Sequence, residues 1–114
     1  MSAPSANKVI DWLRQHMTEV SNQIDSLYLF GSITRGASHP GDCDVLILTL
    51  SEPDSYERRV LRSRIRAAES DFLVVFGIPL SVILLGVQEY HSLRWFKRKG
   101  REKTLVRIDL VHPT

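Results

Sequence analysis

The sequence predicts a single-domain α/β protein, over residues 1–114, in which helices pack on a mixed sheet. A chain of 114 residues is long enough to bury one hydrophobic core. Two segments repeat apolar residues at helical three- and four-residue steps, and short apolar runs bounded by turn residues lie between and after them. No internal repeat or linker divides the chain, so the alternating order predicts one layered sandwich.

The first half is expected to contain a helix, a strand and a turn. Residues 8–22 form an amphipathic helix in this interpretation, and residues 27–30 form a strand that Gly31 ends. Ser32 is expected to cap a short helical turn that reaches Gly36. The residues that define the helix are Val9, Trp12, Leu13, either His16 or Met17, and Val20.

The second half is expected to continue the alternation. We expect strands over residues 44–50, 80–85 and 104–111, the second of them buried on both faces. A long helix is predicted over residues 56–75 and a short basic helix over residues 93–99. The inward side of the long helix is predicted to carry Val60, Leu61, Ile65, Ala68, Phe72 and Val75.

The composition is that of an ordinary globular protein, with 43% hydrophobic and 25% charged residues. A net charge of +2 does not by itself indicate nucleic-acid binding. One cysteine cannot form an internal disulfide, and the start of the chain lacks the pattern of a signal peptide. The longest apolar run is interrupted by Gly77, Pro79 and Ser81 and is too short for a membrane span. We therefore expect a cytoplasmic protein that does not enter the membrane.

Two aspartates stand one residue apart at the start of an apolar strand. Because side chains alternate along a strand, Asp42 and Asp44 should project to the same side, about 6.6 Å apart along the chain. Two like charges held this close are unfavourable unless positive charge lies between them. Mg²⁺ or Mn²⁺ suits two carboxylates, and Mg²⁺ completes its shell with water and substrate phosphates. The alternative is a pair of solvated turn residues beside Pro40 and Gly41.

A Gly-Ser pair precedes the aspartates and fits a phosphate-binding role. Gly31 allows a sharp bend and a close approach to a ligand, and the amides from Ser32 onward can face an anion. Arg35 could either add positive charge to the same phosphates or point into solvent.

The stretch FGSITRGASHPGDCDVLI resembles the signature of the nucleotidyltransferase superfamily that includes DNA polymerase beta. Gly31 and Ser32 are followed, after nine residues, by Asp42 and Asp44, and residues 31–36 match the GSxxRG form of minimal nucleotidyltransferases. The resemblance implies that Asp42 and Asp44 hold metal ions that bridge a nucleoside triphosphate, ATP above all. A nucleoside monophosphate would pass to a hydroxyl of a protein, an RNA end or a small molecule.

The same resemblance implies possible partners and one departure from the family pattern. Minimal nucleotidyltransferases often pair, as antitoxin-like proteins, with a small helical toxin, and a short chain could also complete its acceptor pocket by self-association. Many members carry a third carboxylate on the strand after the long helix, where this chain has Ser81. Asp109 is the candidate replacement, although a salt bridge to a neighbouring arginine explains it as well.

Other reactive residues carry weaker indications. Cys43 should face the core as an inert thiol, and His39 should lie in an exposed loop without a zinc-binding partner. Arginines crowd the long helix, and basic residues with Trp95 and Phe96 crowd residues 94–103. These basic residues have four possible roles: they form solvated faces, or they contact nucleic acid, the phosphates of the nucleotide or an acidic partner protein.

Overall fold

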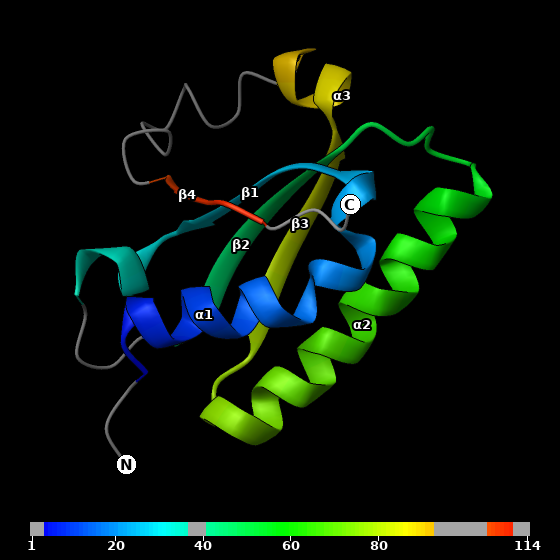
Figure 1. The fold of residues 1–114 in the computed structure, drawn as a ribbon. Helices are drawn as coiled ribbons and strands as arrows, with labels where there is room; N and C mark the ends of the chain where they lie inside the picture. The colour runs from blue at the N-terminus through cyan, green and yellow to red at the C-terminus, as the bar shows by residue number, and fades with distance from the viewer. Residues whose placement is uncertain (1–3, 37–40, 93–104, 111–114) are drawn as a thin grey trace.

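The structure is a computed structural model, and it describes residues 4–36, 41–92 and 105–110, with the side chains of Ser32 and Arg35 outside that description. The described strands form one sheet in the order β3-β2-β1-β4. Two helices, α1 and α2, lie on one face of this sheet, and α3 lies at the end of β3 (Figure 1). The predicted α/β class with a mixed sheet is confirmed.

The elements are, in chain order, α1 (Ala6–His16), the 3-10 helix η1 (Thr18–Gln23), β1 (Ile24–Phe30), the 3-10 turn η2 (Ser32–Arg35), β2 (Cys43–Thr49), α2 (Tyr56–Phe76), β3 (Leu80–Gly86), α3 (Val87–Ser92) and β4 (Val106–Ile108).

The first helix is shorter than predicted. α1 ends at His16, whereas the apolar pattern predicted a helix as far as residue 22. The hydroxyl of Thr18 donates to the carbonyl of Arg14 at 2.7 Å, and Val20 has a non-helical backbone (φ −114°, ψ 15°). A β-branched residue that bonds back to the preceding turn disfavours continued α-helix, so the chain tightens into η1. β1 consequently starts at Ile24, three residues earlier than predicted.

The sheet is mixed because β2 lies between unlike neighbours. β1 pairs antiparallel with both β2 and β4, whereas β2 pairs parallel with β3. α2 is the crossover that a parallel connection requires. Residues 45–48 of β2 are buried, as expected of a central strand.

The two faces of the sheet form two separate hydrophobic clusters. The larger cluster includes Val45, Ile47 and Leu27, and it packs against α1 and α2. Trp12 of α1 makes an edge contact with Phe72 of α2, with ring centroids 5.2 Å apart, which joins the two helices over this face. The opposite face carries a smaller cluster that contains Phe30 and Leu46, with Tyr90 packed against it.

α2 confirms the long helix, with two corrections. It begins after Ser55, whose hydroxyl accepts from the Arg58 amide at 3.1 Å, and ends at Gly77 in the left-handed conformation (φ 73°). Val75 was predicted to face inward but is 58% exposed, because Phe72 and Phe76 occupy the inward side of the last turn. None of the described helices is long and apolar enough to cross a lipid bilayer.

β3 was predicted to be buried on both faces, and this is wrong. It is an edge strand of the described sheet, with Ser81 exposed and residues 82–85 half-buried. An apolar run by itself does not distinguish a central strand from an edge strand that a helix partly covers.

The chain after β3 differs from the prediction where it is described. α3 follows β3 directly and was not predicted, although the Glu89 carboxylate caps its start by accepting from the Gly86 amide at 2.9 Å. The basic helix predicted over residues 93–99 lies outside the described residues. The last predicted strand is present as β4 but is shorter than predicted, because the described residues 105, 109 and 110 are not part of it. The predicted ends at residues 104 and 111 lie outside the described residues.

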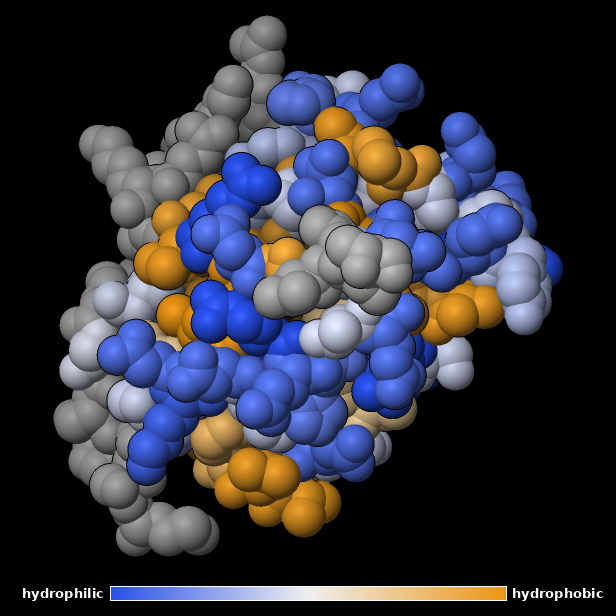
Figure 2. Space-filling model, viewed as in Figure 1, coloured by the Kyte–Doolittle hydropathy of each residue, from blue (hydrophilic) through white to orange (hydrophobic). Residues whose placement is uncertain are grey.

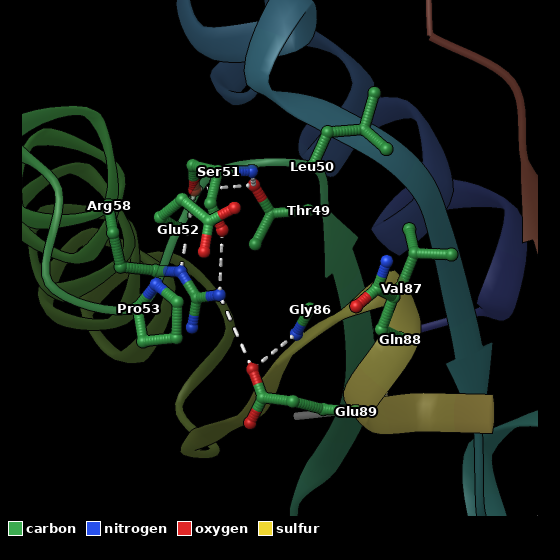
Figure 3. Close-up of a pocket in the computed structure, with 10 residues that line it drawn as sticks. All are labelled: Thr49, Leu50, Ser51, Glu52, Pro53, Arg58, Gly86, Val87, Gln88 and Glu89. Atoms are coloured by element: carbon green, nitrogen blue, oxygen red, sulfur yellow. Dashed lines mark hydrogen bonds and ion pairs between the residues drawn. The ribbon is translucent and has the colours of Figure 1, made fainter. Parts of the chain in front are cut away.

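A buried arginine joins three segments at the carboxyl ends of β2 and β3. The Arg58 side chain is 3% exposed, and its guanidinium donates to the Ser51 carbonyl at 3.0 Å and contacts the Glu89 carboxylate at 3.4 Å. These groups line a pocket of about 240 Å³ between the loop after β2 and the start of α3 (Figure 3). A guanidinium this deeply buried requires such partners, so the contact fixes α3 against α2.

The Arg58 contact predicts a pH-dependent contribution to stability from Glu89. The Gly86 amide and, secondarily, Arg58 lower the pKa of Glu89 in the folded chain. Stability from Glu89 is therefore present above its unfolded pKa of about 4.5 and is lost as the pH falls through the lower folded value. Because Glu89 is 47% exposed, we expect Glu89→Gln to lower the unfolding free energy at pH 7 by at most about 1 kcal/mol.

Urea unfolding of Glu89→Gln and the parent chain at pH 7 and pH 3 measures this effect. The difference between the two unfolding free energies should be smaller at pH 3 than at pH 7, because protonation progressively removes the contribution of the carboxylate. The control is Asp71→Asn, which changes an exposed carboxylate of α2. A difference between Glu89→Gln and the parent chain that is equal at both pH values would contradict the assignment.

Candidate functional site

The two aspartates lie at the start of β2, on the sheet face opposite α1 and α2. Cys43 between them belongs to the core cluster beneath the helices, so alternation turns Asp42 and Asp44 toward the other face. Both aspartates are half-buried. Asp44 is paired in register with Phe30 of β1 and with Ser81 of β3. The aspartates therefore lie where β2 begins, beside the last residue of β1.

Gly31 and Asp44 are in direct contact, although thirteen positions separate them in the sequence. The Gly31 backbone is left-handed (φ 84°), which favours glycine. A Cβ atom at this position would overlap Oδ2 of Asp44 and would lie 3.2 Å from its Cγ. Only glycine leaves room for the Asp44 carboxylate against the backbone at this position, which we call the Gly31 cradle. The predicted association of the Gly-Ser pair with the aspartates is therefore present in the structure for Gly31 and Asp44.

The turn after Gly31 is helical, but its cap differs from the prediction. The Gly31 carbonyl accepts from the Thr34 amide at 3.2 Å, which places Gly31 rather than Ser32 at the cap of η2. The Thr34 hydroxyl donates to the same carbonyl at 2.7 Å. Thr34 was not among the predicted site residues, and a hydroxyl residue three positions after the glycine is the signal that could have identified it. The side chains of Ser32 and Arg35 lie outside the description, so their contact with phosphate stays a prediction.

The electrostatics around Cys43 agree with an inert thiol. Burial raises the pKa of the Cys43 thiol to about 12, and the negative charges of Asp44 and Asp42 add to the shift. A thiolate is therefore strongly disfavoured at neutral pH, and the prediction of an unreactive buried cysteine agrees with this environment. The same shift indicates that both carboxylates lie close enough to Cys43 for their charges to act on it.

The structure describes the surroundings of both candidates for a third acidic position. Ser81 is exposed and lies directly beside Asp44 on the neighbouring parallel strand. Asp109 follows β4, which runs antiparallel to β1, so it lies near the opposite end of β1 from Gly31. The Asp109 carboxylate instead pairs with Arg107 at 3.5 Å. Among the described residues, no group of three histidines, cysteines or acidic residues could hold a metal ion.

Two carboxylates and a glycine cradle form a site that fits a hard divalent cation. Asp42 and Asp44 offer oxygen ligands, the type that Mg²⁺ and Mn²⁺ prefer. Neither side chain is fully buried, so water or a substrate phosphate could reach an ion between them. The residues are thus compatible with a Mg²⁺ site that depends on ligands from a bound nucleotide.

The pocket around Arg58 is not part of this site. It lies at the other end of β2, beside Thr49, which is five residues or about 16 Å from Asp44 along the strand. Its buried arginine already contacts Glu89 and the Ser51 carbonyl. Two acidic residues, Glu52 and Glu89, line the pocket, which makes it a poor place for a triphosphate.

Other sequence-predicted candidates cannot be placed. His39 and the basic residues 94–103, with Trp95 and Phe96, lie outside the described residues. Their proposed roles, including the contact with nucleic acid, stay predictions.

Comparison with known proteins supports the fold at low sequence identity. No protein-family model matches the sequence, and no curated protein matches it. A protein from Sulfolobus solfataricus that is designated a nucleotidyltransferase is 19% identical, with a TM-score of 0.51, and the match covers 89% of this chain and 79% of that protein.

Two structures of the MntA–HpeT toxin–antitoxin pair, each of a different mutant, are also similar. One match is 17% identical with a TM-score of 0.55 and covers 95% of this chain and 74% of the other. The second is 17% identical with a TM-score of 0.50 and covers 92% and 73%. These likenesses show that the chain has the minimal nucleotidyltransferase fold.

Proposed function

We propose that this chain is a metal-dependent nucleotidyltransferase that takes its nucleotide from ATP or another nucleoside triphosphate. The acceptor is a hydroxyl on a protein, an RNA end or a small molecule. The observation that carries the proposal is the cradle at Gly31, which holds the carboxylate of Asp44 beside a helical turn. A solvated pair of turn aspartates would not require a glycine whose missing side chain makes room for one of them.

The roles of the residues follow from their chemistry. Asp42 and Asp44 would hold Mg²⁺ or Mn²⁺, which supplies positive charge to the triphosphate and to the departing pyrophosphate. Gly31 bends the chain so that the amides after it can face phosphate oxygens, and Arg35 would add a further positive charge. The acceptor oxygen bonds to the α-phosphorus, the bond from that phosphorus to pyrophosphate breaks, and the hydroxyl proton passes to solvent.

A second function, binding to a toxin as an antitoxin-like partner, is favoured by two observations. Ser81 beside Asp44 leaves this site with two carboxylates among the described residues, which weakens metal binding. The MntA–HpeT structures also show that proteins of this fold occur in toxin–antitoxin pairs. An adjacent gene for a small helical protein, whose toxicity is relieved equally by this chain and by Asp42→Asn/Asp44→Asn, would favour binding without transfer.

The first prediction concerns the two aspartates. Asp42→Asn/Asp44→Asn removes both charges that would hold the cation, so transfer of label from ATP in Mg²⁺ should fall by at least about 100-fold. Isothermal titration with ATP and Mn²⁺ should show a parallel loss of binding. Asp54→Asn, an exposed aspartate before α2, is the control. Equal binding and transfer by the parent chain and the double variant would remove the proposal.

The second prediction isolates the glycine cradle. Gly31→Ala and Gly77→Ala both place a side chain on a left-handed residue, with φ of 84° and 73°, at a conformational cost of about 1–2 kcal/mol each. Only Gly31→Ala displaces the Asp44 carboxylate, because nothing lies within 4 Å of a Cβ at Gly77. Binding of ATP with Mn²⁺ should be lost in Gly31→Ala and kept in Gly77→Ala. Similar binding by the two variants would exclude the cradle from the site.

The third prediction tests position 81, where this chain has serine and many relatives have a third carboxylate. Ser81→Asp places a carboxylate beside Asp44, so repulsion should lower the unfolding free energy without metal. Affinity for Mn²⁺ should rise by roughly tenfold, because the ion gains a ligand. Thermal unfolding with and without Mn²⁺ measures both effects, and Ser81→Asn is the uncharged control. An unchanged response to Mn²⁺ in Ser81→Asp would show that position 81 does not reach the ion.

A further inference from the structure

The outward face of α2 carries charge and apolar surface that the rest of the described chain leaves uncovered. Arg59, Arg62 and Arg66 are exposed, and none of them forms an ion pair with a described residue, although the charge of Arg62 helps to lower the pKa of Glu89. Their spacing of three and four residues places them in one row along the helix. Arg58 and Arg64, by contrast, are engaged with Glu89 and Glu19.

The same face ends in exposed aliphatic residues. Leu73 and Val74 are 50% and 86% exposed, at the end of α2, whereas Val75 lies about 160° round the helix from Arg59 and belongs to another side. Figure 2 shows a hydrophobic area at the lower end of the molecule, where Figure 1 places the end of α2, with hydrophilic residues above it. Two neighbouring aliphatic side chains in solvent, Leu73 and Val74, lie beside the row of arginines and suggest contact with another surface.

Small residues separate the charged row from the far side of the helix. Ser63, Ala67 and Ser70 are exposed and follow one another at helical steps toward Val74. Small side chains along a helix allow the backbone of a second helix to approach closely, while longer side chains at the flanks make contacts around it. The row of arginines runs along one side of this row of small residues.

We propose that this face of α2 is the docking surface for a helical segment of a partner protein that carries acidic residues followed by aliphatic residues. The surface from Arg59 to Val74 covers 15 residue steps, or about 22 Å, so the partner helix needs about four turns. Carboxylates of the partner pair with the three arginines, and its aliphatic end covers Leu73 and Val74. This proposal rests on the proposed toxin-binding function in one respect, namely that the chain has a protein partner.

Charge complementarity favours this partner over the alternatives. A nucleic-acid backbone could pair with the arginines, but it gains nothing from the aliphatic end of the face. A second copy laid antiparallel on the first would place Arg59 against Val74 of the other copy and would bring Arg66 close to its symmetry mate. A second copy laid parallel on the first would bring the two rows of arginines together, so their like charges would repel. An acidic, amphipathic helix satisfies both halves of the surface at once.

Two synthetic helical peptides provide the test. One has four glutamates at three- and four-residue spacing followed by three leucines, and the other has the reverse order, so both helix directions are covered. A single helix buries less than the roughly 800 Å² per partner of a stable complex, so we expect a dissociation constant in the micromolar range. Chemical shifts of backbone amides should change along the outward side of α2.

Matched variants identify the surface. Arg59→Ser/Arg62→Ser/Arg66→Ser should weaken binding of the peptide by roughly tenfold or more, because three charge pairs are lost. Lys8→Ser/Arg107→Ser, which removes two exposed charges elsewhere, should leave it unchanged. Replacing the peptide glutamates with glutamine should weaken binding to a similar extent, because the same charge pairs are lost. Titration with ATP and Mn²⁺ should be unaffected by the arginine substitutions, so failure of this proposal and failure of the proposed transfer are measured separately.

Three outcomes would overturn the proposal. The first is absence of binding by both peptides at millimolar concentration. The second is binding of single-stranded or duplex RNA that depends on the same arginines while the peptides do not bind, which assigns the face to nucleic acid. The third is concentration-dependent dimerisation in sedimentation equilibrium that Val74→Ser abolishes, which assigns the face to a second copy of this chain.

Discussion

The contact between the carboxylate of Asp44 and the backbone at Gly31 is the constraint that organises the candidate site. It depends on the antiparallel register of β1 and β2, which places Phe30 opposite Asp44 and so brings the next residue to the carboxylate. It also depends on the left-handed bend at Gly31, since an extended residue there would carry the chain away from β2. A change to either feature would separate the aspartates from the turn that could hold phosphates.

The division of the sheet into two faces explains why the site can be open while the core is closed. α1 and α2 cover one face and bury Cys43, so the aspartates on both sides of this cysteine must project from the other. The apolar strand that follows supplies rigidity, because its residues are buried between β1 and β3. The carboxylate of Asp44 is thus carried by a rigid strand, and Asp42 is the residue directly before that strand.

The sequence could predict those parts of the fold that depend on a local pattern of residues. It was less informative about features that tertiary contacts determine. The apolar periodicity was sufficient to predict the long helix α2. The spacing of Gly31 from the aspartates was sufficient to predict that Gly31 and Asp44 lie together. The exposure of Val75 depends on how the last turn of α2 meets the core, and the edge position of β3 depends on strand order. α3 was missed because it follows β3 without an intervening loop.

The position of Ser81 has a consequence for how ligands would bind if the proposed function holds. Two carboxylates neutralise one divalent cation, whereas a third beside Asp44 would add repulsion in the ion-free chain. Serine at this position removes that repulsion, and it also removes a ligand that would hold the ion before the nucleotide arrives. The triphosphate then supplies the remaining oxygens, so the affinity for metal and the affinity for nucleotide must each increase in the presence of the other by the same factor. In the proposed function, a site of this composition would bind the metal–nucleotide complex as one unit and would retain little affinity for either component alone.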